Sequence, residues 1–397
     1  MFVQKPSDYD MSDGFCILRL LINHKPIAML PQHSRRAFLQ RLGLGTILST
    51  GALSAIADKP VYRNQKKLGI ALVGLGSYAK NQLAVALEKT EHCYLAGIVT
   101  GTPAKAVEWS KKYNIPQQNI YNYQNFDQIA NNKDIDIVYV VLPNSMHHEY
   151  VLRAAKAGKH VMCEKPMSVS VKEAEEMVKA CKDAGVQLGI GYRMHFEPFT
   201  QEVMRIGQQK VFGDVRFIQT NFGFTIGDPT QWRLKKELAG GGPLMDVGIY
   251  CVQASRYTTG EEPLWVTAQF GPVTDKQRFT TVEESISWQM QFPGNAMVNG
   301  FSSYRSNIEQ LYVSAANGWA QLGPAYSYGP IKGKTSQGEM NFPVVHHQTA
   351  MLNGICKEFL ENNKFPAHTS GEEGLRDMKI LMGIYEAAKT GKKIKLA

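Results

Sequence analysis

Two segments of the sequence carry side chains that could transfer a proton or hold a polar substrate. Glu164 and Lys165 directly follow a strand-like run, HVMC. The segment GGGPLMDVGIY places Asp246 and Tyr250 four residues apart. On a helix, that spacing puts both side chains on one face, one above the other. A lysine, an aspartate and a tyrosine are therefore candidates for acid–base chemistry.

Each segment also has a purely structural interpretation. The Glu-Lys-Pro triplet at 164–166 can be no more than a charged exit from a strand. Asp246 can be a first-turn partner of a helix dipole, and Tyr250 a core aromatic with a solvated hydroxyl. The three glycines and Pro243 suit a flexible loop that enters a helix, with the proline near its first turn.

A third segment, LGIALVGLGSYA, is typical of a dinucleotide-binding turn between a strand and a helix. A buried strand over 68–74 leads into Gly74, which permits a tight turn, and Gly76, which lets a pyrophosphate approach the backbone. Ala79 allows the helix to pack closely on the strand, and the helix N-terminus holds the phosphate. Such a triplet alone is a weak signal. The strands and helices around it decide whether it indicates a dinucleotide-binding site.

The elements that must position these residues follow in a regular order. Strand-like runs at 94–99, 136–143 and 160–166 alternate with helical stretches. This alternation predicts a parallel sheet wound on both faces, with ligands at the carboxyl ends of its strands. Later in the chain, VRFIQTNFGF and SISWQMQFP are strand-like, and KILMGIYEAAKTG is helical. The fold class is therefore α/β followed by α+β.

Residues at the end of the second strand indicate which nicotinamide cofactor is bound. An NAD enzyme usually places Asp or Glu there, against the ribose 2′-hydroxyl. This chain has Thr100, Gly101 and Thr102 instead, and Lys105 follows at the start of the next helix. A hydroxyl and a cation can bind a 2′-phosphate, so the sequence predicts NADP rather than NAD.

The bulk composition excludes several classes of protein. With 397 residues, 44% apolar and 20% charged, the chain is long enough for two domains. The net charge is +9, but no long basic run or basic and aromatic stripe indicates nucleic acid. Six dispersed cysteines argue against a disulfide scaffold. No metal is predicted, because the adjacent His346 and His347 have no acidic or thiol partner nearby in sequence.

The N-terminal residues are similar to an export signal. The pattern SRRAFLQ at 34–40 resembles a twin-arginine signal, and the apolar run after it ends in the cleavage-like Ala-Ile-Ala at 55–57. That run is too short and too rich in Gly, Ser and Thr for a membrane anchor. Met29 is an alternative true start. A basic turn before a core helix is the competing interpretation.

Five motifs together resemble one family: GLGSYA, LPNSMHHE, GKHVMCEKPMS, GYRMHFEP and QWRLKKELAGGGPLMDVGIY. They are similar to the glucose-fructose oxidoreductase branch of the Gfo/Idh/MocA oxidoreductases, over residues 67–395. The resemblance implies a Rossmann domain and then an α+β domain with a large, mostly antiparallel open sheet, whose outer face commonly forms an oligomer interface. The expected segments are a leader over 1–57, a short arm over 58–66, a Rossmann NADP-binding domain over 67–191, and a substrate and oligomerisation domain over 192–397.

In that family the lysine of the EKP motif and the aspartate and tyrosine of the DxGxY motif line the sugar site, which matches Lys165, Asp246 and Tyr250. We predict that Tyr250 transfers the proton. A phenol with an ordinary pKa of about 10 is a poor base at neutral pH, so it needs a nearby cation, which Lys165 can supply. Asp246 would orient Lys165 or hold a sugar hydroxyl.

The predicted contacts with ligands extend beyond these three. His195 is assigned to the substrate with them. The residues predicted to contact the cofactor come from the glycine turn, the end of the second strand and the family motifs: Gly74, Gly76, Tyr78, Ala79, Thr100, Lys105, Tyr121, Leu142, Asn144, His147, Glu164, Lys165, Arg193, Trp232 and Arg233. His147 can instead be a helix-start residue and His195 a satisfied buried histidine. Trp232 and Arg233 can form an ordinary packing pair.

Export and a nicotinamide cofactor together suggest a function. A periplasm offers little free cofactor, whereas the twin-arginine route exports folded proteins that can carry NADP with them. We expect a periplasmic sugar oxidoreductase with tightly bound NADP that oxidises an aldose to its lactone and reduces a second sugar to an alditol. We also expect a homo-oligomer, a dimer or a tetramer, with no membrane anchor. The arm over 58–66 is shorter than in the glucose-fructose branch. The sequence therefore does not decide whether NADP is tightly retained or whether the subunits form a tetramer.

Three other functions remain open. A conventional NADP-dependent sugar dehydrogenase or reductase would exchange its cofactor in every cycle. An exported glycosidase would use bound NAD for transient oxidation, against which Thr100 and Lys105 argue. A catalytically silent sugar sensor could share the fold, since fold does not dictate function. The intact set of Lys165, Asp246 and Tyr250 argues against the sensor.

Overall fold

The computed structural model describes residues 67–396. The export-signal pattern, the cleavage pattern and the short arm lie outside these residues.

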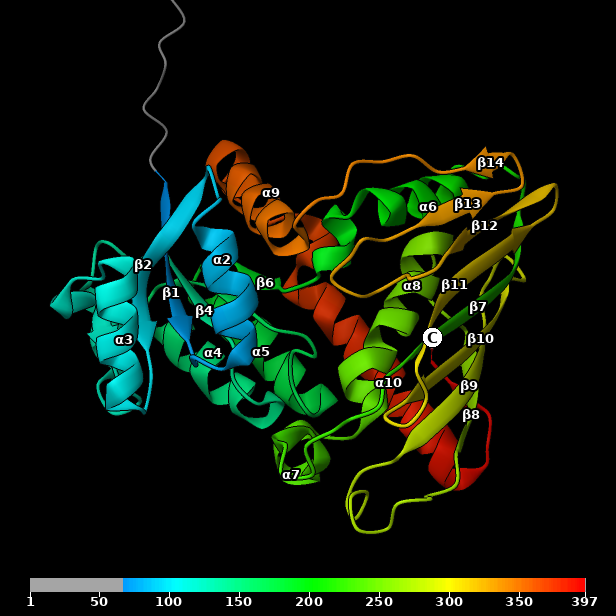
Figure 1. The fold of residues 1–397 in the computed structure, drawn as a ribbon, viewed down its shortest axis with the longest axis horizontal. Coiled ribbons are helices and arrows are strands. Elements are labelled where there is room, and N and C mark those ends of the chain that lie inside the picture. The colour runs from blue at the N-terminus through cyan, green and yellow to red at the C-terminus, as the bar shows by residue number, and fades with distance from the viewer. Residues whose placement is uncertain (1–66, 397) are drawn as a thin grey trace, which may run out of the picture. The chain divides into compact units, whose positions relative to one another are not determined.

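A six-stranded parallel sheet forms the first part of the fold (Figure 1). Its strand order is β3-β2-β1-β4-β5-β6, and every neighbouring pair is parallel. Each residue of β1 and β4 is buried, as expected where helices cover both faces of a sheet. The predicted doubly wound sheet is confirmed. Its strands are β1 Leu68–Val73, β2 Cys93–Val99, β3 Ile120–Tyr121, β4 Ile137–Val140, β5 His160–Cys163 and β6 Leu188–Ile190.

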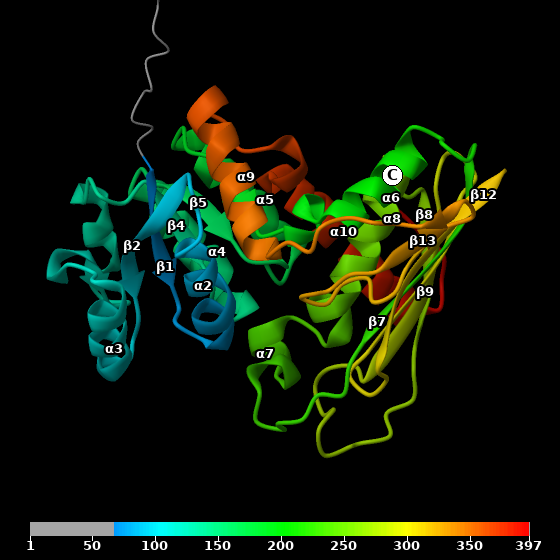
Figure 2. The same cartoon turned by 45° about the horizontal axis from the view of Figure 1, so that its top comes forward.

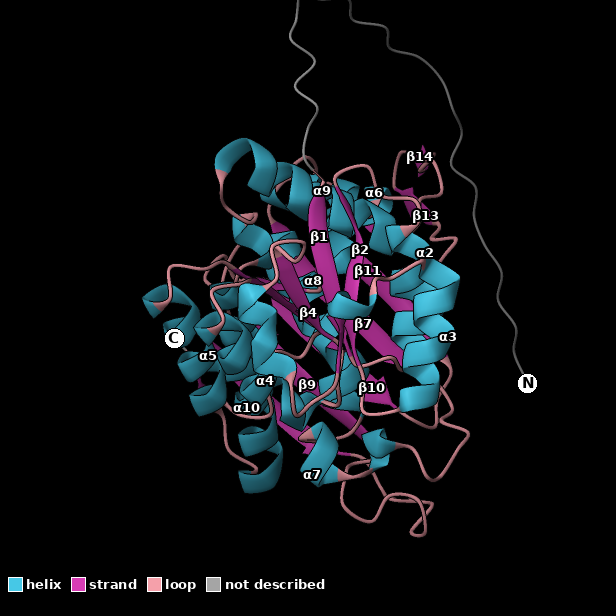
Figure 3. Cartoon of the chain, turned by 90° about the vertical axis from the view of Figure 1, so that its left-hand side faces the viewer, coloured by secondary structure: helices cyan, strands magenta, loops and turns pink. Residues whose placement is uncertain are grey.

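Helices connect these strands. The one after β1 begins with a π-helical turn, and α4 and α5 pack against each other (Figure 3). Ser170 caps α5 by accepting a hydrogen bond from the Glu173 N–H, as a serine N-cap commonly does. The bounds are η1 Ala79–Leu83, α2 Ala84–Leu87, α3 Pro103–Tyr113, α4 His147–Lys156 and α5 Val171–Asp183. Short 3₁₀ turns lie at η2 Gln117–Asn119, η3 Phe126–Asn131, η4 Asn144–Met146, η5 Arg193–Phe196, η6 Trp232–Leu234 and η8 Ala367–Thr369.

The second sheet has nine strands in the order β14-β13-β12-β11-β7-β10-β9-β8-β15. All neighbours are antiparallel except β7 and β10, which confirms the expected mostly antiparallel sheet. In β9, buried and more exposed residues alternate, which is typical of a strand with one face on a core. The strands are β7 Val215–Gly223, β8 Trp265–Phe270, β9 Ser285–Gln291, β10 Met297–Ser303, β11 Ile308–Ala315, β12 Gly318–Leu322, β13 Gly333–Thr335, β14 Gly338–Glu339 and β15 Ile394–Lys395.

Helices from the second half of the chain pack on both sheets. Against the second sheet lie α6 Pro198–Gln208, α8 Ile249–Thr259 and α10 Gly371–Thr390, while α7 Lys236–Ala239 contacts η4. In contrast, α9 (His347–Asn362) lies beside α2 and β2 (Figure 2). Its Met351, Leu352 and Ile355 are buried in one cluster with residues of β1. The chain therefore returns to cover the first sheet after building the second.

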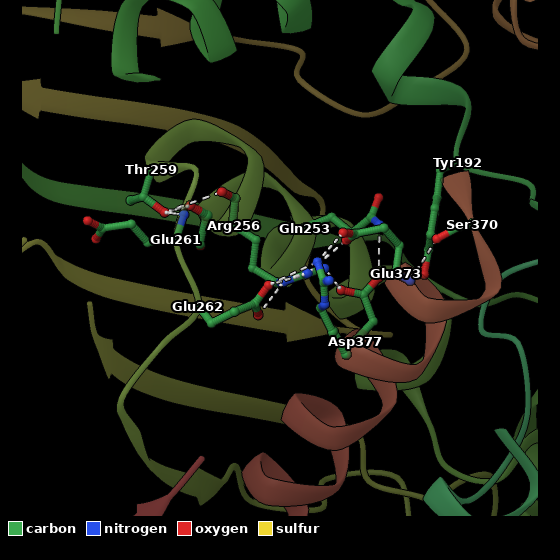
Figure 4. Close-up of polar contacts among 11 residues, drawn as sticks. Tyr192, Gln253, Arg256, Thr259, Glu261, Glu262, Ser370, Glu373 and Asp377 are labelled. Atoms are coloured by element: carbon green, nitrogen blue, oxygen red, sulfur yellow. Dashed lines mark hydrogen bonds and ion pairs between the residues drawn. The ribbon is translucent and has the colours of Figure 1, made fainter. Parts of the chain in front are cut away.

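A buried ion cluster fastens α8 to α10 (Figure 4). The Arg256 side chain, only 6% exposed, donates to Asp377 over 2.6 Å, to Glu373 over 2.8 Å and to Glu262 over 2.8 Å. Breaking such a buried pair by removing one partner typically costs about 3–5 kcal/mol. The cluster thus fixes α8, the helix on which Tyr250 lies.

The described residues hold five cysteines, Cys93, Cys163, Cys181, Cys251 and Cys356, all buried and none in a disulfide. No helix between residues 67 and 396 combines the length and apolar character needed to cross a bilayer.

Candidate active site

Lys165, Asp246 and Tyr250 come together where the end of β5 meets the start of α8. The Lys165 Nζ donates a hydrogen bond to the backbone oxygen of Asp246 over 2.6 Å and lies 3.6 Å from its Oδ1. It also lies 4.8 Å from the centre of the Tyr250 ring. The side chains of Lys165 and Asp246 are 13% and 17% exposed, so this contact is largely shielded from water. The first sheet thus supplies the lysine, and the α8 segment supplies the aspartate and the tyrosine.

The backbone around Asp246 is wound more loosely than an α-helix. Residues Leu244–Gly248 form a π-helical turn, η7, in which the Ile249 N–H donates to the Leu244 carbonyl five residues earlier. The spacing of Asp246 and Tyr250 predicted a regular α-helical face, and this wider turn was not foreseen. Both residues nevertheless contact Lys165. Turns of this kind are frequent at functional sites.

The glycines before this turn form a loop that enters a helix, as expected, but their close packing was not foreseen. A Cβ added to Gly241 would lie 2.0 Å from the Tyr385 hydroxyl, and one on Gly242 would lie 2.5 Å from the Glu283 carbonyl oxygen. The Glu283 carboxylate accepts hydrogen bonds from the N–H groups of Gly242 and Leu244 over 2.9 and 3.1 Å. A carboxylate therefore satisfies the positive end of the helix, and glycines are needed because the backbone approaches so closely.

Asp246 is the anionic centre of the site. Its Oδ2 accepts from Arg233 Nε over 3.0 Å and from the Tyr304 hydroxyl over 3.1 Å. Burial opposes ionisation of Asp246, but Arg233 and Lys165 outweigh it and hold the pKa of this carboxyl below its ordinary value. The Arg233 guanidinium also lies 4.7 Å from the Trp232 ring centre. An ionised Asp246 thus anchors two cations, with Lys165 at Oδ1 and Arg233 at Oδ2.

The cation that hydrogen-bonds the Tyr250 hydroxyl is Arg193. Its Nε donates to that hydroxyl over 3.2 Å, whereas Lys165 lies over the ring face. Arg193 is 3% exposed, and its Nη1 donates to His347 Nδ1 over 2.7 Å. The family motifs assigned Arg193 to the cofactor, and its contact with Tyr250 was not anticipated. Lys165 and Arg193 therefore place two positive charges against one phenol.

Glu164 is buried beside Lys165. Its Oε1 accepts a hydrogen bond from the Tyr139 hydroxyl over 2.6 Å. Burial raises the pKa of Glu164, although the hydrogen bond from Tyr139 and the charge of Lys165 oppose that rise. Gly191 makes room for this pair, because a Cβ there would lie 2.7 Å from the same carboxylate oxygen.

His147 supports the lysine rather than meeting the predicted catalytic residues directly. Its ring nitrogens lie 3.0 Å from the Pro166 carbonyl oxygen and 2.9 Å from that of Leu142. Burial lowers the pKa of His147 to about 4, against the pull of these carbonyls. The ring therefore ties the turn after Lys165 to the end of β4. Asn144, on the same connection, donates to the Ala239 carbonyl of α7 over 2.9 Å.

The structure does not bring His195 to this cluster. Its ring packs against Tyr257 and His368, with ring centres 5.4 and 5.0 Å away. These residues line a pocket with Arg256 and Glu373. Burial lowers the pKa of His195 to about 3, so its imidazole is neutral. His195 is buried, as the alternative interpretation expected, but it is not satisfied, because its Nδ1 has no hydrogen-bond partner.

The turn after β1 leaves space for a dinucleotide. Gly74 has φ of +93°, and a Cβ there would lie 2.6 Å from the Val141 carbonyl oxygen, so glycine is required. A Cβ on Gly76 would meet no protein atom within 4 Å, which leaves the backbone open to a ligand. Ala79, the first residue of η1, is fully buried. These features fit a pyrophosphate at a helix N-terminus.

The donor set at the end of β2 fits a 2′-phosphate. Lys105, on α3, donates from Nζ to the Leu75 carbonyl over 3.0 Å, so its ammonium lies at the glycine turn. Thr100 directly follows β2, and its Oγ1 accepts from the Thr102 N–H over 3.2 Å. Residues 100–102 include no carboxylate that would repel a phosphate. Tyr121, the last residue of β3, is buried, and its hydroxyl accepts from Asn132 over 2.8 Å.

Sequence reasoning missed several residues around this site. They lie outside the quoted motifs and show no spacing that links them: Tyr139, Glu283, Tyr304, Tyr326, Tyr328, His347 and Tyr385. Only the aromatic Gly-Pro loop AYSYGP could have indicated an unusual connection.

His346 caps α9 by accepting from the Thr349 N–H. Within residues 67–396, no three His, Cys, Asp or Glu side chains gather in a way that could hold a metal ion.

Two family profiles match most of the described chain. Residues 68–192 match the GFO/IDH/MocA oxidoreductase profile with an NAD-binding Rossmann fold, and residues 200–320 match the GFO/IDH/MocA C-terminal domain. The D-xylose 1-dehydrogenase [NADP(+)] of Haloarcula marismortui is 28% identical, over 82% of this chain and 92% of the relative. The trans-1,2-dihydrobenzene-1,2-diol dehydrogenase of Xenopus laevis is 31% identical, over 61% of this chain and 70% of the relative.

A solved structure is more similar still. The aldose-aldose oxidoreductase from Caulobacter crescentus, complexed with glycerol, is 41% identical. It superposes with a TM-score of 0.81 over 83% of this chain and 100% of that structure. The likeness therefore spans both sheets.

Proposed function

Because the chain belongs to the Gfo/Idh/MocA family of oxidoreductases, we propose that it is a sugar oxidoreductase that retains NADP, oxidises an aldose to its lactone and reduces a second sugar to an alditol. The observation that carries this proposal is the contact of Lys165 and Arg193 with Tyr250 beside the carboxyl end of β5. Ligands bind at this edge of a doubly wound sheet.

The side chains suggest how the proton moves. When bound, nicotinamide supplies the hydride-accepting carbon. Tyr250 takes the proton of the sugar hydroxyl, and the hydrogen bond from Arg193 stabilises the resulting phenolate. Lys165 adds positive charge at the ring face and is held there by Asp246. In the reverse half of the cycle, Tyr250 returns the proton to the second sugar.

The choice of NADP rests on the end of β2. Thr100 supplies a hydroxyl and Lys105 a cation where an NAD enzyme usually has a carboxylate. The names of two relatives, D-xylose 1-dehydrogenases of Haloarcula marismortui and Haloferax volcanii, specify NADP(+). These residues could hold the 2′-phosphate, while the turn at Gly74 and Gly76 could hold the pyrophosphate.

The nature of the second substrate separates two candidate functions. The name of the 41% identical neighbour, an aldose-aldose oxidoreductase, favours a second aldose as the acceptor. The xylose dehydrogenases favour a conventional enzyme that exchanges its cofactor. The export-signal pattern favours the enzyme that uses two sugars, because a periplasmic enzyme needs to regenerate its cofactor in place. An export route for folded proteins also suits the five buried cysteines, which carry no disulfide.

We further propose a homo-oligomer assembled on the outer face of the second sheet.

One experiment distinguishes these functions. The mature protein is purified and denatured, and any released nucleotide is identified by chromatography. The native protein is then incubated with pairs of aldoses without added cofactor, and lactone and alditol are measured. Equal amounts of both products, with ping-pong kinetics, are expected. A protein that is purified empty and needs added NADP for every turnover is a conventional dehydrogenase. Sugar release from a chromogenic glycoside would instead identify a glycosidase.

A further inference from the structure

Tyr328, from the second half of the chain, contacts the helix that follows the glycine turn. It lies on the loop between β12 and β13, which extends toward α2 (Figure 2). Its ring stacks on that of Tyr78, with centres 6.4 Å apart and planes inclined by 29°. The two residues are far apart in sequence, since Tyr78 begins the helix after the glycine turn. Tyr328 is nevertheless 54% exposed.

The backbone under Tyr328 is firmly held. The N–H groups of Tyr326 and Ser327 both donate to the Glu309 carboxylate. Their carbonyl oxygens accept from Arg193. The Tyr326 ring is fully buried. Tyr328 therefore projects from an anchored base, and its exposure does not come from a loose loop.

Arg193 links Tyr328 to the predicted catalytic tyrosine. The guanidinium carbon lies 4.9 Å from the Tyr250 ring centre and 4.8 Å from that of Tyr328. A guanidinium at this distance from an aromatic face is attracted to it. The planar cation thus holds Tyr328 against Tyr78 while it donates to the Tyr250 hydroxyl.

The position of this stack matters for a bound dinucleotide. A dinucleotide would extend from Lys105, past the turn at Gly74 and Gly76, to Lys165. Tyr78 lies at the middle of that route, directly after the glycine turn. A ring that crosses from the second sheet to Tyr78 therefore closes over the part of the site where the pyrophosphate would lie. The arm over 58–66, which could have covered a cofactor, is short.

We propose that Tyr328 is a cofactor-retaining residue, whose stacking on Tyr78 must open before a nicotinamide dinucleotide can leave. The inference rests on the proposed function, since it explains how NADP is retained without a long arm. The contact that retains the cofactor is the ring rather than the hydroxyl, because stacking and the Arg193 contact both use the aromatic face.

The test measures how fast NADPH leaves the full-length mature protein. Wild type, Tyr328→Ala and Tyr328→Phe are loaded with NADPH, and the loss of bound-nucleotide fluorescence is followed after excess NADP is added. Removing the ring is expected to raise the dissociation rate by about fivefold to tenfold, while the phenylalanine variant stays within about twofold of wild type. Tyr94→Ala is the matched control, because Tyr94 is a similarly exposed tyrosine (40%) and lies at the start of β2, at the end of the sheet away from the glycine turn. It should leave the rate unchanged.

Several outcomes would overturn the proposal. An unchanged rate in Tyr328→Ala, with the thermal midpoint preserved, would show that the ring does not retain the cofactor. A raised KM for the sugar with an unchanged release rate would assign Tyr328 to the substrate instead. Equal acceleration in Tyr328→Phe would assign the effect to the hydroxyl. If the wild-type protein itself releases NADPH within seconds, the proposed function with retained NADP is refuted. The ratio of the NADPH dissociation rates of Tyr328→Ala and wild type still tests the role of Tyr328.

Discussion

Arg193 and Tyr250 form the central contact of this site: Arg193 Nε donates to the Tyr250 hydroxyl over 3.2 Å, from 57 residues away in sequence. The same guanidinium donates to His347, 154 residues further on. A cation that is 3% exposed thereby bridges the loop after β6, the helix α8 and the start of α9. Proton transfer by Tyr250 and the docking of α9 beside it are therefore expected to depend on one side chain.

Replacing the phenol tests the proton-transfer role directly. In Tyr250→Phe, the ring remains beside Lys165 but cannot accept or return a proton. We expect kcat to fall by about 10²- to 10⁴-fold with little change in the thermal midpoint. Steady-state kinetics of sugar oxidation would measure this. Tyr257→Phe, on the same helix but packed against His195, should keep wild-type turnover. Full activity in Tyr250→Phe would remove the assignment.

Replacing the arginine tests its effect on the phenolate. Arg193→Lys keeps the charge but loses the planar fork that reaches Tyr250 and His347 together. The hydrogen bond that favours the ionised phenol is then weakened. We expect kcat for sugar oxidation to fall by about 10- to 100-fold while the thermal midpoint stays close to that of wild type. Arg216→Lys, on an exposed position of β7, is the control. An unchanged kcat would show that this hydrogen bond does not assist proton transfer, and a strongly lowered thermal midpoint would indicate a structural role.

Cofactor preference provides a third test. Lys105→Ala removes the ammonium that lies at the glycine turn. Loss of a charge-assisted contact to the 2′-phosphate should raise the Kd for NADP by about tenfold. The Kd for NAD should stay unchanged, because NAD has no phosphate there. Fluorescence titration with both cofactors measures these constants. Lys111→Ala is the control for net charge, because it removes an exposed lysine from the same helix. Equal losses for NAD and NADP would refute the phosphate contact.

Three buried histidines should make stability depend on pH. Burial lowers the pKa of His195 and of His347 to about 3, and that of His147 to about 4. In the unfolded chain each would bind a proton below pH of about 6.5. Because only the unfolded state takes up these protons, the free energy of unfolding should fall as pH drops from 6.5 toward 3. Each histidine contributes a slope of about 1.4 kcal/mol per pH unit.

Urea unfolding at several pH values between 7 and 5 measures this slope. His195→Phe should lower it by the contribution of one histidine, whatever the change in stability at pH 7. His92→Phe is a control, because His92 lies near the surface just before β2. An identical slope in His195→Phe and wild type would mean that His195 is protonated in the folded protein.

The sequence by itself determined the local parts of this protein. The glycine turn, the parallel strands around it and the strand before Glu164 follow from side-chain periodicity and turn chemistry, which act over a few residues. The absence of a carboxylate after β2 is likewise readable from residues 100–102. The family motifs pointed to Lys165, Asp246 and Tyr250, which the structure brings into contact.

Only the tertiary structure decided which distant side chains complete the site. The packing of two sheets selected Arg193 rather than Lys165 as the hydrogen-bond donor to Tyr250, placed Tyr328 against Tyr78 and kept His195 apart. The same packing turned the glycines before Asp246 into a close contact with Glu283. Such contacts join segments tens to hundreds of residues apart. They depend on how whole elements dock, which no local pattern encodes.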